Sequence, residues 1–99
     1  MKMNLVMVED TLSVMSFEEF YSATFNPETE YKFFFTLEVS GKNYKERKSD
    51  LEEKAHEYQN ATSEYTGLSY GEYAILDRFF EDNGRRYGIL TEFRENCIY

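Results

Sequence analysis

The sequence predicts an α+β protein, in which a small antiparallel sheet packs against three to four helices. Three observations indicate this fold class. Residues 31–39 alternate between two sets of side chains with a period of two, which is typical of a half-buried strand. Three capping boxes precede stretches with helical spacing. Aromatic residues make up 18% of the chain and AVILMFWYC residues 41%, which is enough apolar material for a packed core.

We expect the sheet to contain segments 2–8 and 31–39, with 44–47 as a candidate return strand after a turn at 40–43. A helix starting at Asn26-Pro27 is the alternative for the second segment. It would spread three consecutive phenylalanines around the helix, so we favour the strand. In that strand one face would carry Tyr31, Phe33, Phe35, Leu37 and Val39.

Four helices are predicted, over residues 17–24, 50–64, 70–83 and 86–96. The first three follow the capping boxes that begin at Ser16, Ser49 and Ser69. Asn83-Gly84 is expected to end the third helix, and the very short connection after it predicts an αα-hairpin with the fourth.

With 99 residues the chain has room for one domain, spanning 1–99. Its single cysteine, Cys97, excludes an intramolecular disulfide. The short apolar patch near the N-terminus is interrupted by Glu9 and Asp10, and no stretch reaches the roughly 18 apolar residues that span a bilayer. We therefore expect a cytoplasmic protein without membrane contact.

The sequence offers little for catalysis. His56 is the only histidine and lies in a highly charged stretch, which favours a solvated surface residue. Glu53 and His56 form a Glu-x-x-His half-motif, but a di-iron site would need a second copy. Cys97 lies too near the chain end for an ordered thiolate pocket. We predict no catalytic residue, no metal and no cofactor.

The formal charge of −8 is unevenly distributed. Residues 1–41 carry seven acids against two bases, and residues 49–84 carry nine against two. Between them, residues 42–48 form a basic island, which we interpret as a solvated turn and whose role we leave open. Such a balance disfavours direct binding of nucleic acid or of anionic membranes.

The acids of 49–84 exceed what helix capping and first-turn positions explain. We therefore predict a module that binds a basic protein, such as a nuclease or a nucleic-acid-binding complex, in the sharpest case by mimicking nucleic acid. In composition alone the chain resembles the small acidic inhibitors of host nucleases (anti-restriction and anti-CRISPR proteins) that phages and mobile elements encode. The alternative is a structural accessory protein, such as a homodimer, whose charge serves solubility. The candidate partner-binding residues are Glu52, Glu53, Glu57, Glu64, Glu72, Asp77, Glu81, Asp82, Tyr65 and Tyr70.

Overall fold

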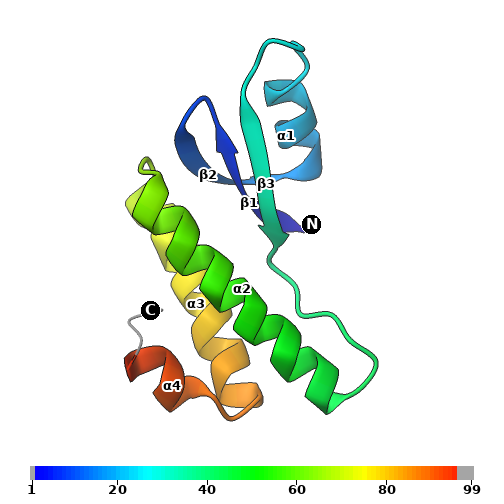
Figure 1. Cartoon of the computed structure of the whole chain (residues 1–99), viewed down its shortest axis with the longest axis vertical. Coiled ribbons are helices and arrows are strands. Elements are labelled where there is room, and N and C mark those ends of the chain that lie inside the picture. Colours follow the sequence, from blue (N-terminus) through cyan, green and yellow to red (C-terminus); the bar gives the residue numbers. More distant parts are fainter. Residues whose placement is uncertain (1, 96–99) are drawn as a thin grey trace.

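The α+β prediction is confirmed by a computed structural model, which describes residues 2–95. A three-stranded antiparallel sheet has the order β2-β1-β3, and four helices pack around it (Figure 1). The elements are β1 (Met3–Val8), β2 (Thr11–Ser16), α1 (Phe17–Ala23), β3 (Tyr31–Thr36), α2 (Tyr44–Glu64), α3 (Tyr70–Arg86) and α4 (Leu90–Glu95).

The strand β2 was not predicted from the sequence. It pairs with β1 through a two-residue turn in which Glu9 and Asp10 both have positive φ, at 50° and 63°. This geometry matches the twist of a hairpin, but it usually carries glycine or asparagine, so the turn signal is weak in the sequence. Leu12 and Val14 of β2 are buried on the same face of the sheet as Leu5 of β1.

The predicted single apolar face of 31–39 is wrong, because β3 ends at Thr36 and contains a bulge. Phe33 lies opposite Val6 and Phe35 lies opposite Leu5, so Phe34 is the extra residue. Phe33 therefore packs on Phe20 of α1, while Phe35 contacts Phe80 of α3 on the other face.

The predicted strand at 44–47 is also wrong, because α2 begins at Tyr44 rather than at residue 50. Asn43 is the N-cap and its side-chain oxygen accepts a hydrogen bond from the N–H of Glu46 at 2.9 Å. The residues that follow are strong helix formers, so the Ser49–Glu52 capping box lies inside a helix that has already started.

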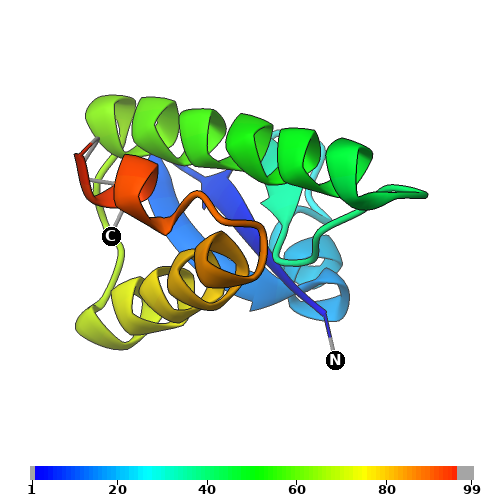
Figure 2. The ribbon, with the colours of Figure 1, turned by 90° about the horizontal axis from the view of Figure 1, so that it is seen from below.

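Helix α3 continues through Asn83-Gly84 to Arg86, so the predicted stop at residue 83 and the predicted helix start at residue 86 are both displaced. Gly84 is buried, and a Cβ built on it would lie 2.9 Å from Phe93 of α4. The glycine thus permits close helix packing instead of ending the helix. The chain reverses at Gly88, with φ of +72°, and α4 returns against α3 as the predicted hairpin requires (Figure 2).

The two faces of the sheet are covered differently. Helix α1 packs on one face through Phe20, and α2 and α3 lie on the other, while α4 packs on α3 at the end away from the sheet (Figures 1 and 2). The main core lies on the second face around Phe80, which is fully buried and contacts the rings of Phe35, Tyr58, Phe79 and Phe93. This arrangement leaves the outer edge of β3 beside α2.

Candidate protein-binding site

Three predicted partner-binding acids lie along one exposed face of α2. Glu53, Glu57 and Glu64 are separated by four and seven residues, which places them on the same side of the helix. At about 1.5 Å per residue they extend over about 16 Å. Within residues 2–95 none of them makes an ion pair or a hydrogen bond. We call these three residues the acidic strip.

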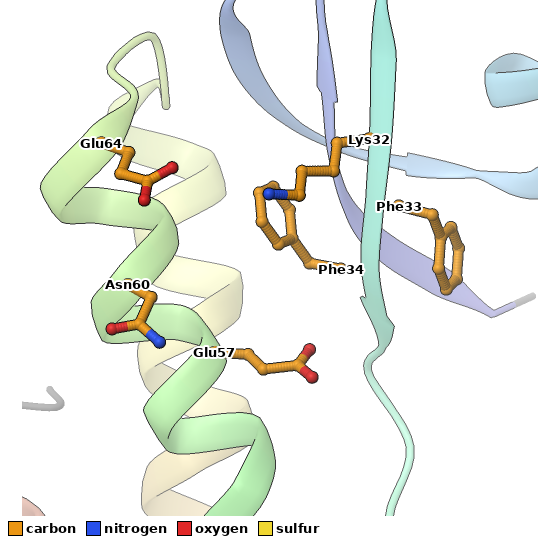
Figure 3. Close-up of a pocket in the computed structure, with 6 residues that line it drawn as sticks. All are labelled: Lys32, Phe33, Phe34, Glu57, Asn60 and Glu64. Carbon is orange, nitrogen blue, oxygen red and sulfur yellow. The ribbon is translucent and has the colours of Figure 1, made fainter.

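A groove of about 320 Å³ separates the acidic strip from β3 (Figure 3). Figure 3 shows the side chains of Lys32 and Phe34 directed toward α2, whereas the ring of Phe33 points away. Phe33 therefore borders the groove through its main chain. The six lining residues are Lys32, Phe33 and Phe34 from β3 and Glu57, Asn60 and Glu64 from α2.

The groove has a net negative lining with an aromatic wall. The Nζ of Lys32 lies 5.6 Å from the centroid of the Phe34 ring, in cation–π geometry. In the described part of the chain no carboxylate comes within ion-pair distance of Lys32. Glu57 and Glu64 thus outnumber the one ammonium group of the groove, and their charge is not neutralised there.

The outer edge of β3 presents main-chain groups to solvent. Glu9 N–H donates to Glu30 C=O at 2.9 Å, so residue 30 directs its main chain toward β1. Because alternate residues of an antiparallel strand point to opposite sides, Tyr31 and Phe33 direct their N–H and C=O groups outward. Among residues 2–95, no other element donates to or accepts from these two main chains. We call this the open edge.

The open edge is flanked by exposed aromatic rings on the α1 side of the sheet. Tyr31 and Phe33 of β3 are 56% and 42% exposed, and Phe17 at the start of α1 is 37% exposed. The rings of Phe17 and Phe33 are stacked with centroids 6.0 Å apart, and Tyr31 meets Phe20 edge-on. Exposed and mutually packed aromatics are typical of protein interfaces.

Glu72 forms the capping box predicted with Ser69 and, beyond that prediction, also binds β2. Its carboxylate accepts hydrogen bonds from the Val14 N–H at 2.6 Å, the Ser13 hydroxyl at 2.8 Å and the Ser69 N–H at 2.9 Å. Partial burial acts to raise the pKa of Glu72, but the hydrogen bonds from Ser69, Val14 and Ser13 outweigh it and lower the pKa below its usual value. This carboxylate is therefore already occupied within the fold.

The acids at the middle of α3 lie close to α2. Burial, and then the charge of Glu81, raise the pKa of Asp77. Burial, followed by the charges of Asp77 and Tyr73, raises the pKa of Tyr58 to about 12. Glu81 itself pairs with Arg85 at 3.1 Å. These acids interact with one another and with Arg85, unlike those of the acidic strip.

The remaining candidates are dispersed. Glu52 is half-buried and lies roughly 100° around α2 from Glu53, while Asp82 is exposed on α3 next to Glu81. Tyr65 packs on Phe34 with ring centroids 6.2 Å apart, so it supports the wall of the groove. Tyr70 is 92% exposed at the start of α3.

The other chemical candidates add no site. His56 is exposed on α2. Within residues 2–95 no group of three or more histidines, cysteines, aspartates or glutamates is arranged to hold a metal ion. Cys97 and the end of the predicted 86–96 helix lie outside the described residues. Among the described helices, none combines the length and apolar character needed to cross a membrane.

Two parts of this site have no signal in the sequence. Regular alternation of 31–39 predicts Lys32 and Phe34 on the face opposite Phe35, and the bulge that turns Phe34 and Phe35 to the same side has no sequence signal. The open edge was missed because strand order follows from β2, which was not predicted. The exposure of Tyr31, Phe33 and Phe17 is visible only in the structure, because the alternation of 31–39 predicts Tyr31 and Phe33 on an apolar face.

No protein-family model, no curated protein and no solved structure matches this chain.

Proposed function

We propose that this chain is a non-enzymatic, cytoplasmic protein-binding module whose acidic surface recognises a basic protein partner. One observation carries the proposal: the acidic strip is exposed, and among residues 2–95 no cation lies within ion-pair distance of its three carboxylates. Glu53 and Glu57 are four residues apart on one helix, where like charges cost a few tenths of a kcal/mol. The fold gains no stability from this arrangement of carboxylates. A basic partner would instead bind to them favourably.

The charge spacing favours recognition of a basic segment over full mimicry of duplex DNA. The acidic strip places three carboxylates along about 16 Å. A DNA duplex carries one phosphate charge per about 1.7 Å, or about ten over the same length. Mimicry of a nuclease substrate, the sharper form of this proposal, would need the acids of α3 in addition.

A matched pair of triple variants tests the proposal. Glu53, Glu57 and Glu64 are changed to glutamine in one variant. In the other, the exposed acids Glu18 and Glu28 are changed to glutamine and Asp10 to asparagine, so both variants have the same net charge. Affinity capture from lysate is performed at low and high salt. We expect basic proteins to be captured at low salt by the wild type and the second variant, and lost from the first variant. Equal loss from both variants would show that only net charge matters, and would contradict the proposal.

A structural accessory role is the second candidate, supported by an apolar hollow of about 360 Å³ at the lower end of the sheet. It is lined by Met3, Leu37, Ile75 and Phe79, with Lys2, Glu38 and Arg78 at its rim. Light scattering of the purified chain distinguishes the two roles. A stable dimer that an Ile75→Lys substitution dissociates would favour the accessory role.

A further inference from the structure

We propose that the open edge of β3 receives an extended segment of the basic partner as a fourth strand of the sheet, with basic and apolar side chains in alternation. This inference rests on the proposed function and specifies where and how the partner binds. It starts from the outward main-chain groups of Tyr31 and Phe33, which no other element of residues 2–95 uses. An added strand would pair with these groups, and main-chain hydrogen bonds of this kind supply affinity in β-strand addition.

The two sides of β3 define the alternation. A strand lying beside β3 would direct successive side chains to opposite faces of the sheet. On the α1 face they would meet the exposed rings of Tyr31 and Phe33, which favour apolar groups. On the α2 face they would enter the groove that contains Glu57 and Glu64, which favour lysine or arginine.

The groove can accept a basic side chain despite Lys32. Its volume of about 320 Å³ is open between β3 and α2, and Phe34 offers an aromatic surface for a second cation. Two carboxylates, those of Glu57 and Glu64, face one ammonium group. Lys32 should therefore weaken binding of the incoming cation without preventing it.

A second copy of this chain fits the open edge poorly. Antiparallel pairing of two β3 strands through Tyr31 and Phe33 would place Lys32 directly opposite its counterpart in the second copy. Like charges that are directly opposite in a sheet are destabilising. Each copy also carries a net charge of −8, which opposes association. A basic segment removes both difficulties.

The probe is a capped synthetic peptide of eight residues in which arginine and valine alternate. Two control peptides are used. The first has the same composition but groups the four arginines together. The second has the same sequence but is N-methylated at the residues whose N–H groups would face β3. Binding is followed by amide chemical shifts in NMR. We expect the largest chemical-shift changes at Tyr31 and Phe33. Both controls should bind at least about tenfold more weakly, because the N-methylated peptide loses main-chain hydrogen bonds to β3 and the grouped peptide cannot place arginine and valine on the correct faces.

Two pairs of variants locate the cation. Glu57 and Glu53 are exposed glutamates one turn apart on α2, but only Glu57 lines the groove. We expect Glu57→Gln to weaken the peptide about threefold to tenfold and Glu53→Gln to change it less than twofold. Lys32→Gln should strengthen binding, because it removes the competing ammonium group. Weaker binding of the peptide to the Lys32→Gln variant would show that the groove does not receive its basic side chain.

A third pair tests the main chain. Tyr31→Pro removes an outward N–H at the first residue of an edge strand, where proline is tolerated, and Tyr31→Thr removes the same ring but keeps the N–H. We expect the proline variant to bind the peptide at least about fivefold more weakly than the threonine variant. Equal affinities, together with an unaffected N-methylated peptide, would overturn strand addition.

The outcomes separate this inference from the proposed function. Binding that depends on salt, responds equally to Glu53→Gln and Glu57→Gln and ignores N-methylation would retain a basic partner but reject the open edge as its site. Absence of binding by the peptide, combined with equal loss of capture in the two triple variants, would reject both. Dimerisation through β3, detected as Tyr31 and Phe33 shifts that depend on protein concentration without peptide, would also overturn the inference.

Discussion

The two edges of the sheet differ in how their main-chain groups are used. At the outer edge of β2, Leu12 N–H donates to Thr66 C=O at 2.9 Å and Val14 N–H donates to the carboxylate of Glu72. Thr66 also forms a parallel bridge with Thr11. We call this the covered edge. At the open edge of β3, Tyr31 and Phe33 have no comparable partner among residues 2–95. Uncovered edges invite pairing with other chains, so this asymmetry supports our proposal that a partner segment would bind at β3.

Gly67 offers the strongest way to break the covered edge. Its φ is +118°, and an added Cβ would lie 2.4 Å from the Cγ2 of Thr11. Gly67→Ala would therefore be strained in its backbone and would push Thr66 away from β2. We expect a loss of about 3 kcal/mol in the free energy of unfolding, measured by urea denaturation. The control is Gly71→Ala, because no atom lies within 4 Å of a Cβ at Gly71. A loss below about 1 kcal/mol for Gly67→Ala would contradict this account of the edge.

Removing the Glu72 carboxylate should have the next largest effect. Glu72→Ala leaves the Val14 N–H without its acceptor and also breaks the capping box with Ser69. We expect destabilisation of about 2 kcal/mol. Glu52→Ala on α2 serves as the matched control, since its carboxylate makes no hydrogen bond within residues 2–95. Equal stability of the two variants would refute a structural role for Glu72.

Acid should weaken the covered edge, because Glu72 holds it. The pKa of Glu72 is lowered in the folded state, so its contribution to stability is fully present above its unfolded pKa, near 4.5, and is lost as the pH falls through the folded value. We expect Glu72→Gln to flatten the acid limb of the stability profile in thermal melts between pH 5 and 2. The effect should be smaller than that of Glu72→Ala, because the glutamine still supplies an acceptor. An unchanged acid limb would argue against this linkage.

Substitution of Lys32, between the two residues of the open edge, should affect stability least. Lys32→Gln removes an exposed cation–π contact, so we expect a change of about 0.5 kcal/mol or less in the free energy of unfolding.

Amide hydrogen exchange compares the covered edge with the open edge without any mutation. Leu12 and Val14 should be protected by their acceptors, whereas Tyr31 and Phe33 should exchange rapidly. Protection of Tyr31 and Phe33 equal to that of Leu12 would show that the open edge is covered in solution.

The fold could be predicted from the sequence where short-range signals decide the structure. The capping boxes at Ser16 and Ser69 do start α1 and α3, and the stripe that contains Leu76 and Phe80 is buried as its helical spacing predicts. It failed where tertiary contacts decide the outcome. Gly84 is a helix interior residue because Phe93 packs on it, and Glu72 is structural because Val14 lies beside it.

The candidate site shows the same division. Exposure of Glu53, Glu57 and Glu64 follows from helix periodicity, so the acidic strip could be predicted. The neighbouring groove could not, because it depends on the bulge at Phe34 and on which edge of the sheet β3 occupies. Both features are set by strand register, which no short segment specifies.

The bulge in β3 has a consequence for aggregation. Regular outward pairing positions occur at Tyr31 and Phe33, about 7 Å apart, and the bulge at Phe34 then interrupts the register. A guest strand could therefore form only a few main-chain bonds before losing alignment. Such a short contact would exchange rapidly and could not template a growing stack of strands. The bulge would thus help to keep this acidic chain from forming fibrils.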